Sequence, residues 1–213
     1  MKKLLVFISL LGFIGCAPTK ITKTWRAEDA LAKKYKKVLV LSVLPESEKD
    51  LGVSIENHLA DDLRGMGYLA IAANKIFPYG TFVKGDTTRA AKAIEGKGFD
   101  GIMTIVLLDK KKEPYYVPGK ITDYSNFDKY SRFDRYYNTV AENIYAPGYY
   151  GEETKYIWEN NFYDLTTRER IYSARTRSFD FTSKNTLAHT YGMLMAQSLI
   201  KNNILQKPEY MTE

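Results

Sequence analysis

Apolar runs alternate with helical patterns between residues 38 and 108. The segment Val38–Leu44 is an almost uninterrupted apolar and β-branched run, which predicts a strand that is covered on both faces or lies centrally in a sheet. Residues 47–50 have the spacing of a capping box, and apolar residues then recur at helical intervals over 55–66. The further expected elements are a strand at Tyr68–Ala72, a short helix around Ala90–Ile94 and a strand at Phe99–Leu108. This order is β-α-β-α-β, and helical crossovers of this length favour parallel neighbouring strands.

The periodicity stops over residues 109–151. This segment holds nine of the 17 tyrosines and three of the seven prolines. It reads as a long Tyr-rich loop, and a loop of this length in a compact domain is uncommon and usually functional or mobile.

Regular patterns return in the last third of the chain. Lys155–Leu165 and Arg170–Phe179 are expected to form an antiparallel β-hairpin. A last helix follows, capped by Ser183 or Asn185. The apolar pair at 204–205 is expected to hold the end of the chain against the core.

These elements predict a single α/β (or α+β) domain over residues 36–205, followed by a tail at 206–213. We expect a mixed sheet of about five strands with helices mainly on one face. The order is β-α-β-α-β, the Tyr-rich loop, the hairpin and a C-terminal helix.

Met1 is followed by two lysines and by an uncharged apolar stretch, Leu4–Ile14. A membrane-spanning helix needs about 20 residues, so this stretch is too short to span and has the size of the apolar part of a signal peptide. It is followed by Gly15 and by Cys16, the single cysteine of the chain. Because no second thiol is present, an intramolecular disulfide is excluded.

Residues 12–16 resemble the lipobox of bacterial lipoproteins, with Gly15 as the small residue before the cut and Phe13 where leucine is usual. The resemblance implies that residues 1–15 are removed as a signal peptide and that Cys16 receives a diacylglycerol thioether and a further acyl chain. Residues 16–35 would then be the anchor and tether, with room for a short helix around Ala27–Lys34. The alternative interpretation is a buried N-terminal helix with an incidental cysteine.

The residue after the cysteine is Ala17, which does not resemble the aspartate retention signal of inner-membrane lipoproteins in enteric bacteria. We therefore expect an outer-membrane anchor that faces the periplasm. Two or more acyl chains hold a protein stably on a bilayer, whereas one chain binds only marginally.

The net charge changes little when the signal peptide is removed: 29 basic and 25 acidic residues remain, a balance of +4. No basic stripe or known motif accompanies this mild charge, so nucleic-acid binding is not expected. The basic residues gather instead near the anchor, where they could lie against anionic lipid head groups or simply form a solvated tether. They are Lys20, Lys23, Arg26, Lys33, Lys34, Lys36 and Lys37.

Several features together resemble a group of uncharacterised envelope lipoproteins of Gram-negative bacteria. They are the lipobox, the start of the first strand at 36–40, the glycines at 65 and 67, the stretch at 98–102, the tyrosines at 115–116 and 136–137, and the hairpin at 162–174. Tyr172 stands where tryptophan is common in that group. The layout is also similar to the small α/β domains of the curli-secretion lipoprotein and of the N-terminal part of the Tol periplasmic protein. The resemblance implies a fold and a location more than an activity.

Candidate chemistry is sparse. His58 and Asp62 are four residues apart on an expected helix face, which is a possible metal pair, but a solvated polar face is the more common outcome, as it is for His189. Asp100 opens a strand and is expected to have a capping or turn role. The acidic pair at 152–153 and the aspartates at 123, 128 and 134 are available for glycoside chemistry but lie in the expected loop. We expect no catalytic residue, metal or cofactor.

The Tyr-rich loop is the main functional candidate, with Tyr136, Tyr137, Tyr149 and Tyr150 as candidate partner-binding residues. Tyrosine combines apolar area with a polar tip and suits protein or glycan recognition. In the alternative interpretation these rings cover one face of the sheet. We expect a non-catalytic binding or scaffold protein with an envelope protein or a glycan as partner. A periplasmic hydrolase or carbohydrate-binding protein is the alternative, and the sequence leaves the oligomeric state open.

Replacing Cys16 with serine is expected to release the protein from membranes, because the thioether needs the thiol sulfur. Detergent partitioning and flotation of cell extracts measure this. Unchanged partitioning of the Cys16→Ser protein would refute lipidation.

Overall fold

The computed structural model describes residues 19–78, 81–82, 87–117, 133, 148–179 and 183–207. Cys16, Tyr136 and Tyr137 lie outside this described part. The chain divides into two compact units, the first comprising residues 1–110 and 156–213 and the second residues 111–155.

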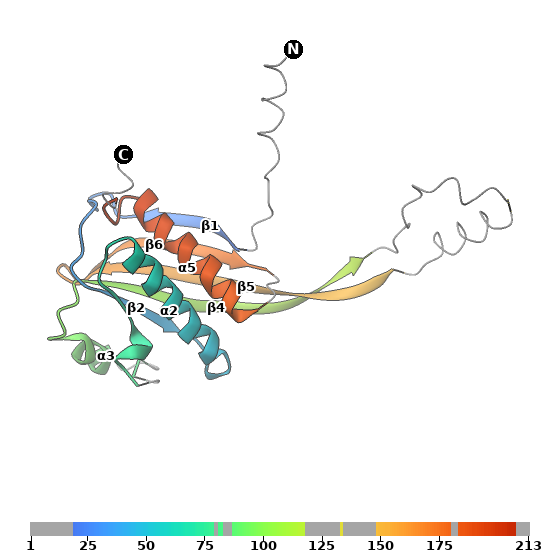
Figure 1. The fold of residues 1–213 in the computed structure, drawn as a ribbon, viewed down its shortest axis with the longest axis horizontal. Helices are drawn as coiled ribbons and strands as arrows, with labels where there is room; N and C mark the ends of the chain where they lie inside the picture. The colour runs from blue at the N-terminus through green and yellow to red at the C-terminus, as the bar shows by residue number, and fades with distance from the viewer. Residues whose placement is uncertain are drawn as a thin grey trace, which may run out of the picture. The chain divides into compact units, whose positions relative to one another are not determined.

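The strands form a six-stranded mixed sheet with the order β1-β6-β5-β4-β2-β3 (Figure 1). Strand β2 is parallel to β3 and to β4, whereas β6 is antiparallel to both β5 and β1. The predicted α/β class, parallel β-α-β-α-β half and antiparallel hairpin are therefore confirmed. The strands are β1 (Thr19–Arg26), β2 (Val38–Val43), β3 (Ala70–Ala72), β4 (Gly101–Val117), β5 (Tyr149–Asp164) and β6 (Glu169–Ser178).

Strand β2 is buried on both faces, as its uninterrupted apolar run predicts. Val38 and Val40 contribute to the larger core cluster, while Leu39 and Leu41 contribute to a second cluster. Successive side chains of a strand point to opposite faces, so the two clusters lie on opposite sides of the sheet.

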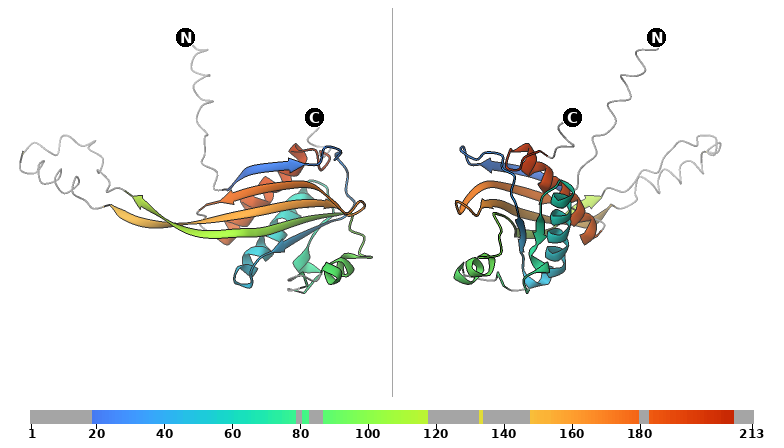
Figure 2. Two further views of the ribbon diagram at one scale, coloured as in Figure 1. Left: turned by 180° about the vertical axis from the view of Figure 1, so that it is seen from behind. Right: turned by 60° about the vertical axis from the view of Figure 1, so that its left-hand side comes forward.

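Two long helices cover the face of the larger cluster (Figure 2). They are α2 (Lys49–Gly65) and α5 (Lys184–Lys201). The shorter α3 (Thr87–Ile94) packs against the second cluster through Ala93 and Ile94. The expectation of helices mainly on one face is thus confirmed. Among the described residues, no helix is both long enough and apolar enough to cross a membrane.

The two long helices begin differently. Ser183 is the N-cap of α5, and its hydroxyl accepts a hydrogen bond from the backbone N–H of Thr186 at 3.1 Å, as predicted. The capping box predicted at residues 47–50 is wrong. Residues 46–48 form a short 3-10 helix, η1, and Glu48 precedes α2 without a side-chain cap. The Glu48 carboxylate instead pairs with Lys110 at 2.5 Å, because burial of this acid requires a cation.

Strand β1 lies within the segment that the sequence assigned to the tether. Its residues pair with β6 from Thr19, opposite Ser178, to Arg26, opposite Tyr172. The sheet therefore has six strands rather than about five, and residues 27–34 contain no helix. The open edge of β6 offers hydrogen-bond partners to this lysine-rich segment, whose apolar pattern alone is too weak to predict a strand.

The predicted Tyr-rich loop is shorter than expected at both ends. Strand β4 continues to Val117 and β5 begins at Tyr149, so residues 109–117 and 149–151 are strand. The tyrosines at these ends have high strand propensity. The lysines at 110–112 and Pro114 interrupt the apolar pattern by which a strand is recognised in the sequence.

A buried polar network joins α5 to the hairpin. The Tyr191 hydroxyl donates to Asn160 Oδ1, and the Asn160 amide donates to the Ala174 carbonyl oxygen at 3.2 Å. Asn160 and Tyr191 are both completely buried. Each polar group in this network therefore depends on its protein partner rather than on water.

Replacing Tyr191 with phenylalanine is expected to lower the free energy of unfolding by about 1–3 kcal/mol, because Asn160 Oδ1 loses its donor in a dry site. Urea denaturation measures the change. The matched control is Tyr150→Phe, which removes an exposed hydroxyl and should change stability by less than about 0.5 kcal/mol. Equal stability of the Tyr191→Phe and control proteins would contradict the role of the network.

Candidate functional site

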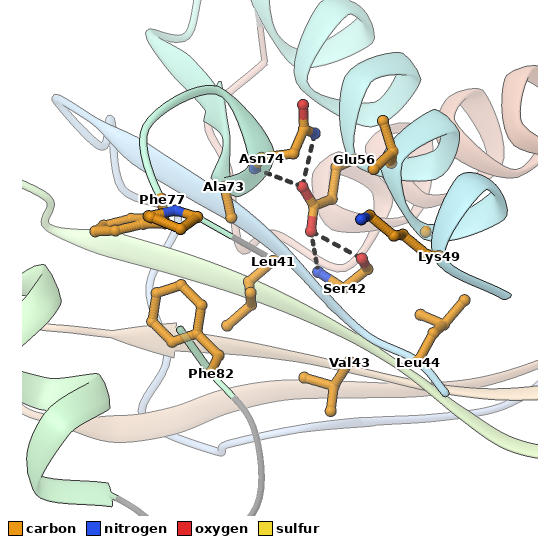
Figure 3. Close-up of a pocket in the computed structure, with 13 residues that line it drawn as sticks. Leu41, Ser42, Val43, Leu44, Lys49, Glu56, Ala73, Asn74, Phe77 and Phe82 are labelled. Carbon is orange, nitrogen blue, oxygen red and sulfur yellow. Dashed lines mark hydrogen bonds between the residues drawn. The ribbon is translucent and has the colours of Figure 1, made fainter. Parts of the chain in front are cut away.

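A pocket of about 270 Å³ lies at the carboxyl ends of β2 and β3 (Figure 3). In open α/β sheets, ligands bind beyond the carboxyl ends of the parallel strands, so this is a usual place for a binding site. The pocket is lined by Leu41, Ser42, Val43, Leu44, Lys49, Gly52, Val53, Glu56, Ala73, Asn74, Phe77, Pro78 and Phe82.

Glu56 of α2 is the central polar residue of the pocket. Its Oε1 accepts from the backbone N–H of Ser42 at 2.7 Å and from the Ser42 hydroxyl at 2.8 Å. Its Oε2 accepts from the backbone N–H and the side-chain amide of Asn74, at 2.8 and 2.7 Å. Glu56 is only 4% exposed, and the hydrogen bonds of its carboxylate connect α2 to the ends of β2 and β3.

Sequence reasoning missed this role of Glu56. The helical spacing could have indicated this role, because it places Glu56 on the same side of α2 as the buried Leu59 and Leu63, where an apolar residue is expected. A charged residue on the buried side of a helix needs several hydrogen bonds, and these come from two other elements.

The pocket suits a small apolar group. Its walls include Leu41 and the rings of Phe77 and Phe82, whose centres lie 5.0 Å apart. The Ser42 hydroxyl and the Asn74 amide donate to Glu56. Apolar side chains thus make up most of the lining, to which Lys49 adds one cationic side chain.

A second candidate site lies in the unit of residues 111–155. We call Tyr115, Tyr116, Tyr149 and Tyr150 the tyrosine ribbon. All four rings are exposed, and those of Tyr149 and Tyr150 are 63% and 77% exposed. The rings of Tyr116 and Tyr150 pack at 5.3 Å between centres. The structure thus places two of the four predicted partner-binding residues, Tyr149 and Tyr150, on an exposed aromatic surface.

The rings of Tyr115 and Tyr116 each pack against the backbone of a glycine. A methyl group at Gly151 would lie 2.6 Å from Cζ of Tyr115, and one at Gly148 would overlap the Tyr116 hydroxyl. The rings therefore lie directly over glycine backbone, an arrangement that orders an aromatic ring and protects the strand. Since neighbouring strand residues point to opposite faces, Tyr115 and Tyr116 present aromatic surface on both faces of the ribbon.

The three carboxylates that the structure describes in this unit are engaged in ion pairs. Glu113 pairs with Lys155, Glu152 with Lys112 at 3.4 Å, and Glu153 with Lys155 at 3.6 Å. Glu152 and Glu153 are consecutive strand residues and point to opposite faces, so they cannot flank one glycosidic bond. The aspartates at 123, 128 and 134 lie outside the described residues.

The fold brings together the two histidines, although nothing in the sequence indicates that they are in contact. The rings of His58 on α2 and His189 on α5 lie 5.6 Å apart. Near them, Asp62 Oδ2 is buried without a hydrogen-bond partner. Burial raises the pKa of Asp62, and the nearby His189 and His58 oppose the shift. Within the described ranges, no group of three His, Cys, Asp or Glu side chains is arranged to hold a metal ion.

Asp100 has the structural role that the sequence predicts. Its carboxylate accepts the backbone N–H groups of Lys36 and Lys37 at 2.8 and 2.9 Å. These hydrogen bonds position the backbone immediately before β2 and occupy both carboxylate oxygens of Asp100.

No protein-family model matches the chain, and a comparison with curated protein sequences finds no match. Solved structures similar to this chain include PelC from Paraburkholderia phytofirmans, described as a dodecamer. The two chains are 12% identical, the match covers 89% of this chain and 99% of PelC, and the TM-score is 0.48. They also include the lipoprotein GNA1162 from Neisseria meningitidis, with 16% identity, coverage of 78% and 96%, and a TM-score of 0.41.

A PDZ domain protein from Parabacteroides distasonis is similar over 85% of this chain and 35% of its own, with 12% identity and a TM-score of 0.39. The similar structures thus include a lipoprotein, but TM-scores below 0.5 do not identify what this chain binds or assembles with.

Replacing Glu56 with glutamine is expected to destabilise the protein by roughly 2–4 kcal/mol, because the new amide must face two donors of Ser42 or of Asn74. Urea denaturation measures the loss. The control is Glu46→Gln, since the Glu46 side chain is 73% exposed and its substitution should have little effect. If the Glu56→Gln protein were as stable as the control, the carboxylate would not be the connection between α2 and the strand ends.

Proposed function

We propose that this chain is a lipid-anchored lipoprotein of the outer membrane, facing the periplasm, that binds an envelope partner protein through the tyrosine ribbon and performs no catalysis itself. The main support for the proposal is the exposed aromatic surface of Tyr149 and Tyr150. Tyr115 and Tyr116 extend this surface, and their rings pack against the backbone of Gly151 and Gly148.

Exposed tyrosines at this density favour a binding role. Each ring offers a large contact area at low cost in conformational entropy, and its hydroxyl can form hydrogen bonds at the rim of an interface. The packing of Tyr115 over Gly151 and of Tyr116 over Gly148 limits ring motion before a partner arrives. Such preorganisation reduces the entropy lost on binding.

A protein fits this surface better than a glycan does. Sugar rings stack on aromatic side chains that lie along one face, whereas the ribbon presents tyrosines on both faces. A protein can enclose a two-stranded ribbon from both sides. The carboxylates beside the tyrosines are paired with lysines, which favours binding over the alternative of a hydrolase.

The anchor and the location rest on the N-terminal sequence. The lipobox resemblance around Cys16 supports lipidation, and the neutral Ala17 supports an outer-membrane destination. Tyr136 and Tyr137 remain candidate contact residues of the same segment.

Replacing Tyr149 and Tyr150 together with serine is expected to abolish partner capture without unfolding the protein, because both side chains are largely exposed. A photoreactive phenylalanine analogue placed at Tyr116 reports capture in intact cells. We expect a discrete protein adduct in the parent and its loss in the double variant.

The matched control is Leu31→Ser with Leu69→Ser, which removes two apolar side chains that are 81% and 53% exposed in the other unit. This control should retain the adduct. An adduct that persists in the tyrosine double variant would refute the proposed site, and an adduct shortened by glycosidases would favour the carbohydrate-binding alternative.

A further inference from the structure

The outer face of β1 and β6 carries a compact group of basic side chains. Lys20 lies directly opposite Arg177, and Lys23 lies directly opposite Arg175. All four side chains are exposed, and we call them the basic face. The helices α2 and α5 cover one face of the sheet (Figure 2), and Tyr172 and Ala174 of β6 belong to the core on that face. Because side chains alternate along a strand, Arg175 and Arg177 point to the opposite face.

A register shift in β1 places Lys23 on this face. The pairing of β1 with β6 slips by one residue between Ile21 and Lys23. Thr22 occupies the shift, and its hydroxyl donates to the Arg175 carbonyl oxygen at 3.1 Å. In an unbroken register Thr22 would face Arg175, and Lys23 would point to the opposite side of the strand.

This arrangement costs stability in the isolated protein, because like charges directly opposite on two strands repel each other. In the described part of the chain, none of the four cations forms an ion pair. Glu159 of β5 is the backbone partner of Arg175, yet no ion pair joins them. An anionic surface would remove this repulsion.

Protection of a sheet edge explains only part of the pattern. Lysines on an edge strand such as β1 discourage pairing with another chain. Strand β6 is not an edge, since it lies between β1 and β5, so Arg175 and Arg177 have no such role.

The basic face also begins close to the expected anchor. Cys16 and Thr19 are three positions apart in the sequence, and such a length of chain spans at most about 11 Å. Phe179 lies beside the first cross-strand pair, with Lys20 Nζ 5.4 Å and the Arg177 guanidinium 6.0 Å from its ring centre. The same face continues to the half-exposed Trp25, which lies under the guanidinium of Arg170. Basic and aromatic residues together are typical of protein surfaces at lipid head groups.

From this geometry we propose that the basic face docks onto the anionic phospholipid head groups of the membrane that holds the protein. The inference rests on the proposed lipid anchor at Cys16, which keeps β1 within reach of the bilayer. Docking by both the acyl chains and the basic face would hold the sheet against the membrane instead of leaving it on a free tether.

Trp25 provides the measurement. The chain has two tryptophans, and Trp158 is completely buried, so acrylamide quenching of fluorescence reports mainly on Trp25. The acylated full-length mature protein is reconstituted into vesicles of phosphatidylcholine alone or with added phosphatidylglycerol. We expect the quenching constant to fall when phosphatidylglycerol is present and to recover at high salt, because salt screens the attraction.

We call the decrease in the quenching constant on phosphatidylglycerol vesicles the protection of Trp25. This protection should be lost completely in the basic-face variant, which should still float with both kinds of vesicle. The variant carries Lys20→Gln, Lys23→Gln, Arg175→Gln and Arg177→Gln. The control removes four exposed lysines elsewhere, through Lys75→Gln, Lys92→Gln, Lys184→Gln and Lys201→Gln, and should keep it. The double variant Lys20→Arg, Lys23→Arg should show the same decrease in quenching as the parent protein, since charge rather than residue type is required.

Equal quenching of the parent protein on the two kinds of vesicle, or full protection in the basic-face variant, would overturn the docking. Failure to float with phosphatidylcholine vesicles would instead overturn the lipid anchor. In that case, flotation with phosphatidylglycerol vesicles alone would support the basic face, and its absence would refute both.

Discussion

The packing of α2 and α5 against one face of the sheet forms the main core of this fold. The core between them contains Trp158, Phe162, Tyr172 and Tyr191, all completely buried. Burial of one such side chain contributes about 1.5–3 kcal/mol. Because both long helices lie on this face, the opposite face of β1 and β6 remains open to charged residues.

The polar groups within this packing are satisfied by partners that are far apart in the sequence. Glu56 reaches Ser42 and Asn74, and Tyr191 reaches Asn160. Such bonds add modest net stability, but breaking one leaves a buried group without a partner, which is costly. They therefore favour one arrangement of helices and strands and also shape the pocket beside Glu56.

The functional proposals use surfaces that this core leaves exposed. The tyrosine ribbon supplies exposed aromatic area, and the basic face supplies positive charge that no described carboxylate neutralises in an ion pair. An aromatic surface suits a protein partner, whereas clustered cations suit an anionic lipid surface. The two proposals therefore concern different partners and different chemistry.

The strands and helices whose apolar pattern is continuous along the chain could be predicted from the residues alone. The apolar run at Val38–Leu44, the hairpin and the Ser183 cap were predictable because each depends on neighbouring residues. The position of β1, the contact of His58 with His189 and the role of Glu56 became evident only in the folded protein. Strand β1 needs the open edge of β6, and the register shift at Thr22 that creates the basic face is visible only once the two strands are paired. Tyr149 and Tyr150 could be named from the sequence because tyrosines are concentrated in one segment, whereas the pairing of β1 with β6 joins residues about 150 positions apart and leaves no periodic pattern in the chain.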